Sequence, residues 1–103
     1  MKEETTTAIN NDSLESSVLL LRAVTHPLRM KILQYIHNHK KAHVNEIYHG
    51  LGIEQSIASQ HLKILRAEHL VFTEKKGTFI FYTVNYDKLS TVIGSVQKFL
   101  EEE

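Results

Sequence analysis

The sequence predicts a mainly α-helical domain with one β-hairpin, and three observations indicate it. Apolar residues recur at spacings of three and four over most of the chain, which is the helical period. Two β-rich runs between residues 70 and 84 flank the pair Lys76-Gly77, which is typical of a hairpin turn. The length of 103 residues suits one domain. We therefore expect about five helices, with a two-stranded hairpin before the last of them.

The chain is expected to begin with a tail and a capped helix. Residues 1–11 are polar and rich in threonine and asparagine, so we expect a flexible tail ahead of a domain at 12–103. Asp12 and Glu15 are spaced like a capping box. The apolar run that follows predicts a first helix over Ser13–Val24.

Three further helices are expected before the hairpin. The single proline, Pro27, ends the first helix and suits the first position of a second over Pro27–Asn38, because a proline there loses no hydrogen bond. His39–His43 is then a polar link. A short third helix over Val44–Gly50 stops at two glycines, and a fourth runs over Gln55–Glu68.

The hairpin and the last helix complete the domain. Leu70–Lys75 and Thr78–Val84 are the expected strands, and Phe79–Tyr82 is apolar on both faces, so we expect both of its sides to be covered. Tyr86–Glu103 repeats apolar residues at spacings of three and four, which predicts an amphipathic helix of about four or five turns.

The charges sum to zero but are unevenly placed. Residues 22–66 hold seven basic and two acidic side chains, whereas both ends of the chain are net acidic. The middle therefore carries a positive field that suits an anionic partner, although random clustering on a solvated surface gives the same count. The sequence contains no cysteine, no run long enough to span a membrane and no signal-peptide core. We expect a soluble cytoplasmic protein without disulfides or thiolate metal sites.

The fourth helix divides into two faces. Six polar or basic side chains fall within an arc of about 140° on a helical wheel. They are Gln55, Ser56, Ser59, Gln60, Lys63 and Arg66. The opposite face is apolar and is expected to pack inward. It holds Ile57, Ala58, Leu62, Ile64 and Leu65. Amides, hydroxyls and cations of this kind hydrogen-bond base edges and phosphates, although many ordinary exposed faces have the same composition.

The neighbouring elements favour nucleic-acid binding. A short helix ending in Leu51-Gly52, a tight link and a helix with this outer face form a helix-turn-helix pattern. Lys75 and Lys76 lie at the expected hairpin tip, where their ammonium groups can reach a phosphate, although a solvated tip has the same residues. We expect double-stranded DNA as the partner.

Three strings resemble the ArsR/SmtB (arsenic-repressor) family of winged-helix transcription regulators, and the resemblance covers roughly Leu14 to the C-terminus. They are HPLRMKILQYI, LGIEQSIASQHLKILRAEHLV and KKGTFIFYTVN. The resemblance implies a winged helix-turn-helix fold, a recognition helix at Gln55–Glu68 and a wing at Val71–Val84. It also implies a homodimer that binds operator DNA, usually represses, and releases the DNA when a metal ion or another signal arrives. The implied DNA contacts are Gln55, Ser56, Ser59, Gln60 and Lys63.

His61 matches the histidine of the family's S-x-H-L pattern. On the wheel, however, it lies within the apolar half of the fourth helix. We therefore expect a packed, hydrogen-bonded side chain rather than a base contact.

The family's sensor sites are missing from the sequence. Soft-metal sensors of the family carry Cys-x-Cys in the third helix, where this chain has His43-Val44-Asn45. Zinc sensors use Asp and His on the last helix, where Asp87 has no histidine beyond it. The histidines between residues 37 and 43 offer imidazoles to a metal, but the two lysines among them would repel a dication. We expect no metal and no cofactor, and the existence of an inducer is left open.

The first and last helices carry more apolar surface than a small core needs, which favours a homodimer formed through them. Closure of the monomer's own core is the alternative. The expected interface residues are Leu14, Val18, Leu21, Leu89, Val92, Ile93, Val96, Phe99 and Leu100. A two-fold dimer would place two recognition helices about 34 Å apart, which implies a palindromic operator read in the major groove.

The sequence thus predicts a dimeric DNA-binding regulator that acts as a repressor. It shows no nucleophile paired with a base and no glycine-rich phosphate loop, so we expect no catalytic activity. Two alternatives stay open: a winged helix used only for protein–protein contact, and a histidine-based metal-responsive protein.

Overall fold

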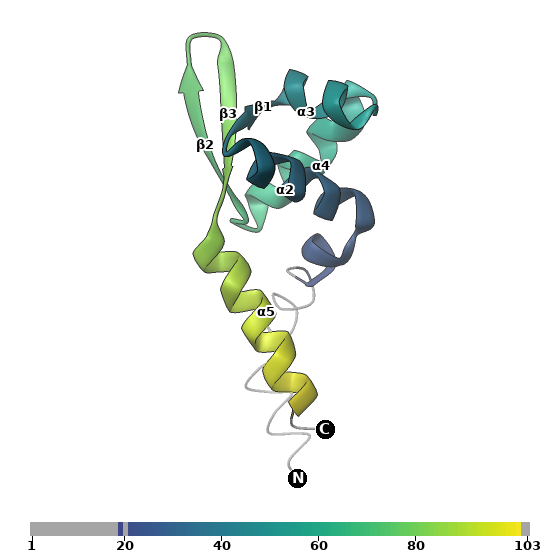
Figure 1. The fold of residues 1–103 in the computed structure, drawn as a ribbon, viewed down its shortest axis with the longest axis vertical. Coiled ribbons are helices and arrows are strands. Elements are labelled where there is room, and N and C mark those ends of the chain that lie inside the picture. The colour runs from purple at the N-terminus through teal and green to yellow at the C-terminus, as the bar shows by residue number, and fades with distance from the viewer. Residues whose placement is uncertain (1–18, 20, 102–103) are drawn as a thin grey trace.

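Figure 1 shows the computed structural model, which describes Leu19 and residues 21–101, with side chains through Gly94. Its helices are α2 (Pro27–His39), α3 (Val44–Leu51), α4 (Gln55–Ala67) and α5 (Tyr86–Glu101). Its strands are β1 (Ala42–His43), β2 (Val71–Lys76) and β3 (Phe79–Val84). Residues 21–25 are also helical. The predicted tail and most of the predicted first helix lie outside the described residues.

Helices α2, α3 and α4 enclose the apolar core. Its fully buried large side chains are Ile32, Ile36, Ile47, Leu62, Leu65 and Leu70. Burying each such side chain stabilises the fold by about 1.5–3 kcal/mol relative to exposure. The inward face predicted for α4 is confirmed at Ala58, Leu62 and Leu65. The prediction is wrong for Ile57, which is 36% exposed. Ile57 lies in the first turn of α4 and near the edge of the apolar arc, where the sequence does not show how far the covering helices extend.

The predicted hairpin is confirmed as β2 and β3, and a third strand that the sequence did not predict, β1, extends it to a three-stranded antiparallel sheet of order β1-β3-β2. The third strand, Ala42–His43, pairs with Tyr82 and Phe81 of β3 and falls inside the predicted polar link. Ala42 is fully buried. A strand of two residues is too short to show an alternating pattern, so the sequence does not reveal it.

The hairpin turn lies one residue later than predicted. Lys76 pairs with Phe79, so the two-residue turn is Gly77-Thr78. Gly77 has φ 63°, which suits the first position of such a turn because a glycine adopts positive φ at no steric cost.

The outer part of the hairpin is less covered than the sequence predicts. Phe79 is 47% and Ile80 is 40% exposed, whereas Val71 and Val84 at the base of the hairpin are buried. In Figure 1 the hairpin extends beyond the helices, so only its base reaches the core.

Two backbone motifs join α4, the wing and α5. His69 has φ 61° and follows α4 in a Schellman turn, in which the N–H groups of His69 and Leu70 bond to Arg66 O and Leu65 O. Asn85 caps α5 by accepting from the N–H of Lys88 at 3.2 Å, and its side-chain amide donates to His69 O at 2.8 Å. These bonds fix the base of the wing relative to α4.

Helix α5 leaves this body and extends away from it (Figure 1). It accounts for much of the 55 Å length of the molecule, which is 23 × 22 Å across. No helix within the described residues is long and apolar enough to cross a membrane.

Gly50 provides a test of the packing between α2 and α3. A Cβ added at Gly50 would lie 2.7 Å from both Cζ and Oη of Tyr35, whereas a Cβ at Gly94 in α5 would meet nothing within 4 Å. Both glycines lie within helices, so alanine brings the same gain in helix propensity at each, and we expect overpacking to make Gly50→Ala less stable than Gly94→Ala by about 1–3 kcal/mol. Gly94→Ala should be neutral or stabilising, because alanine favours the helix. Urea denaturation of both variants measures the difference, and equal stabilities would contradict the packing described here.

Candidate nucleic-acid interface

A tight turn sets α4 against α3. Gly52 has φ 67° and ends α3, and its N–H bonds to His49 O at 3.3 Å. The next N–H, of Ile53, bonds to Tyr48 O at 3.0 Å. Glu54 is extended, and α4 begins immediately after it at Gln55. The short link therefore holds the two helices in the helix-turn-helix arrangement.

The polar and basic face of α4 points away from the core. All six side chains of this face are exposed, as the wheel predicts, and they stand opposite the buried Ala58, Leu62 and Leu65. The exposed residues are Gln55, Ser56, Ser59, Gln60, Lys63 and Arg66. We call this set the α4 outer face. It presents amides, hydroxyls and two cations with no acidic side chain among them.

A groove of about 420 Å³ lies between the α4 outer face and the wing. Ser59, Lys63 and Arg66 line one wall, and the other wall comes mainly from Ile80 and Tyr82 of β3. The two cations and the serine hydroxyl can bind the phosphates of a nucleic-acid backbone that lies along the apolar wall. The groove residues Asn45, Thr78 and Tyr82 were not predicted. Thr78, Ile80 and Tyr82 alternate along the chain, and this spacing is the signal that could have placed Thr78 and Tyr82 on one side, whereas Asn45 of α3 had no such signal.

The two wing lysines lie on opposite faces of β2. Lys75 pairs with Ile80 and so lies on the face of the hairpin that carries Ile80 and Tyr82, whereas Lys76 pairs with Phe79 on the opposite face. Neither is among the residues that line the groove. The structure thus places Lys75 and Lys76 beside the α4 outer face but not within one cluster with it.

Lys41, which the sequence analysis missed, lies next to Lys76. Its ammonium is 5.4 Å from the centre of the Phe81 ring. The pKa of Lys41 is lowered because its amine, once neutral, can accept a hydrogen bond from the neighbouring Lys76 ammonium and because the two charges repel, while Glu74 acts in the opposite direction. Two adjacent cations favour an anion near this edge of the wing.

His43 connects the start of α3 to the wing. Its ring stacks on Phe79 at 4.7 Å and meets Phe81 edge-on at 5.3 Å. Its backbone N–H donates to Glu46 Oε1 at 3.0 Å, and its ring Nδ1 is buried without a hydrogen-bond partner. His43 therefore packs the wing against the helix-turn-helix. Among the described residues, no three histidine, aspartate or glutamate side chains gather in a way that could hold a metal ion.

His61 faces inward from α4, as predicted. It is half-buried, and its Nδ1 lies 3.2 Å from Arg29 Nη1. The packed, hydrogen-bonded role of His61 is confirmed.

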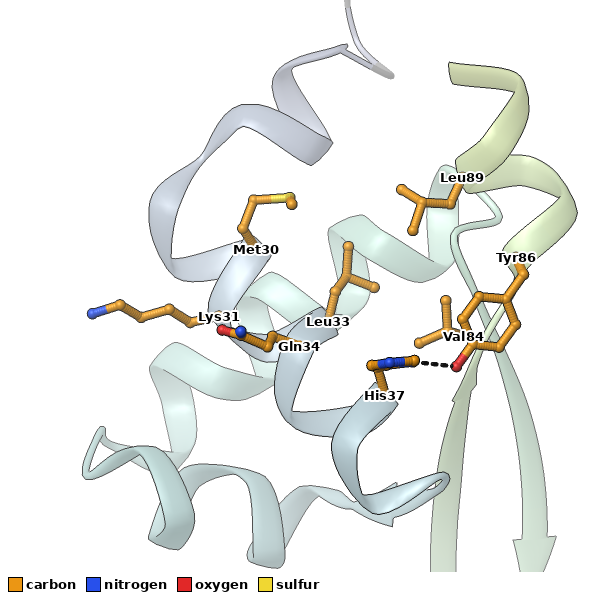
Figure 2. Close-up of a pocket in the computed structure, with 8 residues that line it drawn as sticks. All are labelled: Met30, Lys31, Leu33, Gln34, His37, Val84, Tyr86 and Leu89. Atoms are coloured by element: carbon orange, nitrogen blue, oxygen red, sulfur yellow. Dashed lines mark hydrogen bonds between the residues drawn. The ribbon is translucent and has the colours of Figure 1, made fainter. Parts of the chain in front are cut away.

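A second hollow lies between α2 and the start of α5, on another side of the molecule (Figure 2). Its volume is about 430 Å³, and its apolar walls include Leu33, Val84 and Leu89. Figure 2 shows a hydrogen bond across its edge, where His37 Nδ1 and the Tyr86 hydroxyl are 2.7 Å apart. This bond and the packing of Leu89 hold the first turns of α5 to the body.

The predicted dimer residues have three different surroundings. Leu21 and Ile93 are 41% and 50% exposed. Leu89 packs on the core, and Val92 is only 5% exposed, so Val92 is buried by its own chain and not open to a partner. The remaining predicted positions lie outside the described side chains. They are Leu14, Val18, Val96, Phe99 and Leu100.

Known proteins share both this sequence pattern and this fold. The model of a family described as bacterial regulatory protein, arsR family, matches residues 26–72. The transcriptional repressor PagR of Bacillus anthracis is 36% identical over 81 residues, which cover 79% of this chain and 81% of PagR. The transcriptional activator HlyU of Vibrio cholerae is 34% identical over 77 residues, which cover 75% of this chain and 70% of HlyU. The crystal structure of NolR from Sinorhizobium fredii is 28% identical and superposes with a TM-score of 0.73, covering 87% of this chain and 89% of NolR.

The contact between Lys41 and Lys76 predicts a measurable titration. Replacing Lys76 by glutamine removes the neighbouring cation, so we expect the pKa of Lys41 to rise toward its ordinary value of 10.5. The ¹³C shift of the Lys41 Cε atom, followed against pH, measures this change. Lys75→Gln, on the other face of β2, is the matched control and should leave Lys41 unchanged. An unaltered Lys41 titration in Lys76→Gln would contradict the contact.

Proposed function

Because the chain belongs to the ArsR family of bacterial regulatory proteins, which are DNA-binding transcription regulators and not enzymes, we propose that it is a homodimeric repressor of palindromic operators. The α4 outer face enters the major groove, and the wing contacts the neighbouring phosphates. The protein acts in the cytoplasm, where its DNA is found.

The observation that carries this proposal is the outward direction of the α4 outer face. Glutamine amides can pair bidentately with adenine, serine hydroxyls reach base edges or phosphates, and lysine and arginine bind guanine or phosphate. The groove beside this face adds Asn45, Thr78 and Tyr82 as further polar groups near a bound backbone. The pair Lys41 and Lys76 adds positive charge at the edge of the wing.

The exposed apolar side chains near both ends of the described chain support the homodimer. Leu19 and Leu21 at the start, and Tyr86 and Ile93 in α5, are each at least 41% exposed. Helix α5 extends away from the body (Figure 1), which suits a contact between two copies of the chain. A two-fold pair of such chains presents two recognition helices to successive turns of DNA. We propose repression rather than activation because the repressor PagR is 36% identical to this chain and the activator HlyU is 34% identical.

Selection from random DNA tests the function directly. We expect the protein to enrich duplexes with two inverted half-sites about one helical turn apart. Binding of the enriched duplex should weaken linearly with log[salt], with a slope of about −0.9 per phosphate contact. Enrichment of single half-sites would contradict the dimer. No enrichment at low salt would contradict DNA binding and favour the protein–protein alternative.

Gln60 tests base recognition. Gln60→Ala should weaken binding to the enriched duplex by about 1–3 kcal/mol and relax the preference at one base pair. Fluorescence anisotropy with single-base variants of the duplex measures both effects. Gln34→Ala, an exposed glutamine on α2, is the matched control and should change neither. If the two variants behave alike, the α4 outer face does not read bases.

Lys76 tests the contact of the wing with the DNA backbone. Lys76→Ala should weaken binding to all duplexes alike and make the salt slope shallower by about 0.9, because one phosphate contact is lost. Lys31→Ala, an exposed lysine on α2, should keep the wild-type slope. A loss confined to the enriched duplex would place Lys76 at a base edge instead.

A further inference from the structure

Among the residues that the structure describes, one charged side chain is buried. It is Arg29 of α2, which is 8% exposed. Its guanidinium bonds in two directions. Nε donates to Ala23 O at 3.0 Å, and Nη2 donates to Arg22 O at 2.9 Å. Nη1 donates to Nδ1 of His61 at 3.2 Å. One side chain of α2 thus joins the helical residues 21–25 to α4.

The bond to Ala23 satisfies the end of the first helix. The N–H that would bond to Ala23 O is missing because the residue four positions later is Pro27, whereas Arg22 O also accepts from the N–H of His26 at 3.2 Å. A cation at this end also offsets the helix dipole. Ala23 is fully buried, so water is not a ready substitute for the guanidinium at its carbonyl. The first helix therefore holds the guanidinium of Arg29 in place independently of α4.

The bond to His61 requires a neutral imidazole. A guanidinium has donors only, so His61 Nδ1 must accept and the ring proton must be on Nε2. The charged and titratable groups that face the ring are Arg29 and His26, whose ring centre is 4.7 Å away. Burial lowers the pKa of His61, and the charges of His26 and Arg29 lower it further. Each of these causes favours the form that the hydrogen bond needs.

This bond gives α4 a directional link to α2. The apolar side chains Leu62 and Leu65 decide which side of α4 faces the core, but apolar packing is non-directional, so the hydrogen bond restricts the small rotations that remain possible within that packing. His61 directly follows Gln60 and lies two residues before Lys63, both in the α4 outer face. A small rotation of α4 about its axis would displace these two side chains together.

We propose that Arg29 is a positioning residue for DNA recognition, which holds α4 at one rotation against the first helix through His61, and that protonation of His61 opens this link. The inference rests on the proposed function. Protonation removes the acceptor at Nδ1 and places a second positive charge beside the guanidinium of Arg29. A lower pH therefore reduces the selectivity of DNA binding as well as the stability of the fold.

The sign of the stability effect follows from the lowered pKa. As the pH falls below the ordinary histidine value of 6.5, the unfolded chain takes up the proton before the folded chain does. The contribution of neutral His61 to stability is thus complete above that pH. It is lost progressively as the pH falls toward the lowered pKa of the folded state.

Three variants separate the link from general stability. His61→Asn offers Oδ1 as an acceptor near the position of Nδ1 and does not titrate. His61→Leu has a similar size and no acceptor. His49→Asn, at an exposed histidine of α3, is the matched control. The readout is the ratio of affinities for the duplex enriched by the wild-type protein and for a scrambled duplex of the same composition, at pH 7.5 and 5.5. Histidine charges that act only through attraction to phosphates affect both duplexes alike, so they cancel in the ratio, and His49→Asn checks this.

At pH 7.5 we expect His61→Leu to lower this ratio about tenfold, as the loss of a hydrogen bond to a charged group would, while His61→Asn keeps it. At pH 5.5 the ratio should fall for the wild type and His49→Asn in proportion to the fraction of His61 that the NMR titration described below finds protonated at that pH, but not for His61→Asn. A folded His61→Leu that keeps the wild-type ratio would overturn the inference. So would a His61→Asn variant that loses selectivity in acid as the wild type does.

A ¹⁵N NMR titration of the imidazoles in the free protein tests the link without DNA, and it serves if His61→Leu does not fold. We expect His61 with an unprotonated Nδ1 and a titration midpoint below 6.5. A proton on Nδ1 at pH 7.5 would overturn the inference. If the wild-type protein enriches no duplex, the proposed function fails. If it enriches one and the His61 outcomes above are not met, only this inference fails.

Discussion

Burial of one side of α4 is the constraint on which the rest of the structure depends. Ala58, Leu62 and Leu65 are at most 1% exposed, and Leu62 and Leu65 pack into the same core as α2 and α3. Turning α4 about its axis would move these side chains into water and bury amides and ammonium groups without partners, and both changes are costly. The direction of the α4 outer face is therefore a consequence of core packing rather than of any interaction on that face.

The wing is held to this helix by a different kind of contact. His43 packs on Phe79 and Phe81, while the bonds of Asn85 and the turn at His69 fix the base of the hairpin to the end of α4. The tip of the hairpin carries exposed Phe79 and Ile80 beyond the core. The wing is thus anchored near its base and at β1, and its tip projects beside the α4 outer face.

Periodicity predicted what depends on local pattern and missed what depends on distant partners. The helices, the hairpin and the two faces of α4 follow from spacings within short segments. The strand at Ala42–His43 could not be predicted, because its pairing partner Phe81–Tyr82 is far along the chain. The wheel placed His61 inward, but its partner Arg29 is 32 residues away, and only the packing of α2 on α4 brings them together. Lys41 could not be predicted for the same reason, because its neighbour Lys76 lies on β2, on the far side of β3 in the sheet.

The position of α4 at the DNA is tested most directly by NMR, with the backbone amides followed while an enriched duplex is added. We expect the largest changes in backbone amide chemical shift at the start of α4 and at the hairpin tip, with small changes in α2. The α4 residues concerned are Gln55, Ser56, Ser59 and Gln60. Large changes confined to α2 and α5, with α4 and the wing unaffected, would contradict this position of α4.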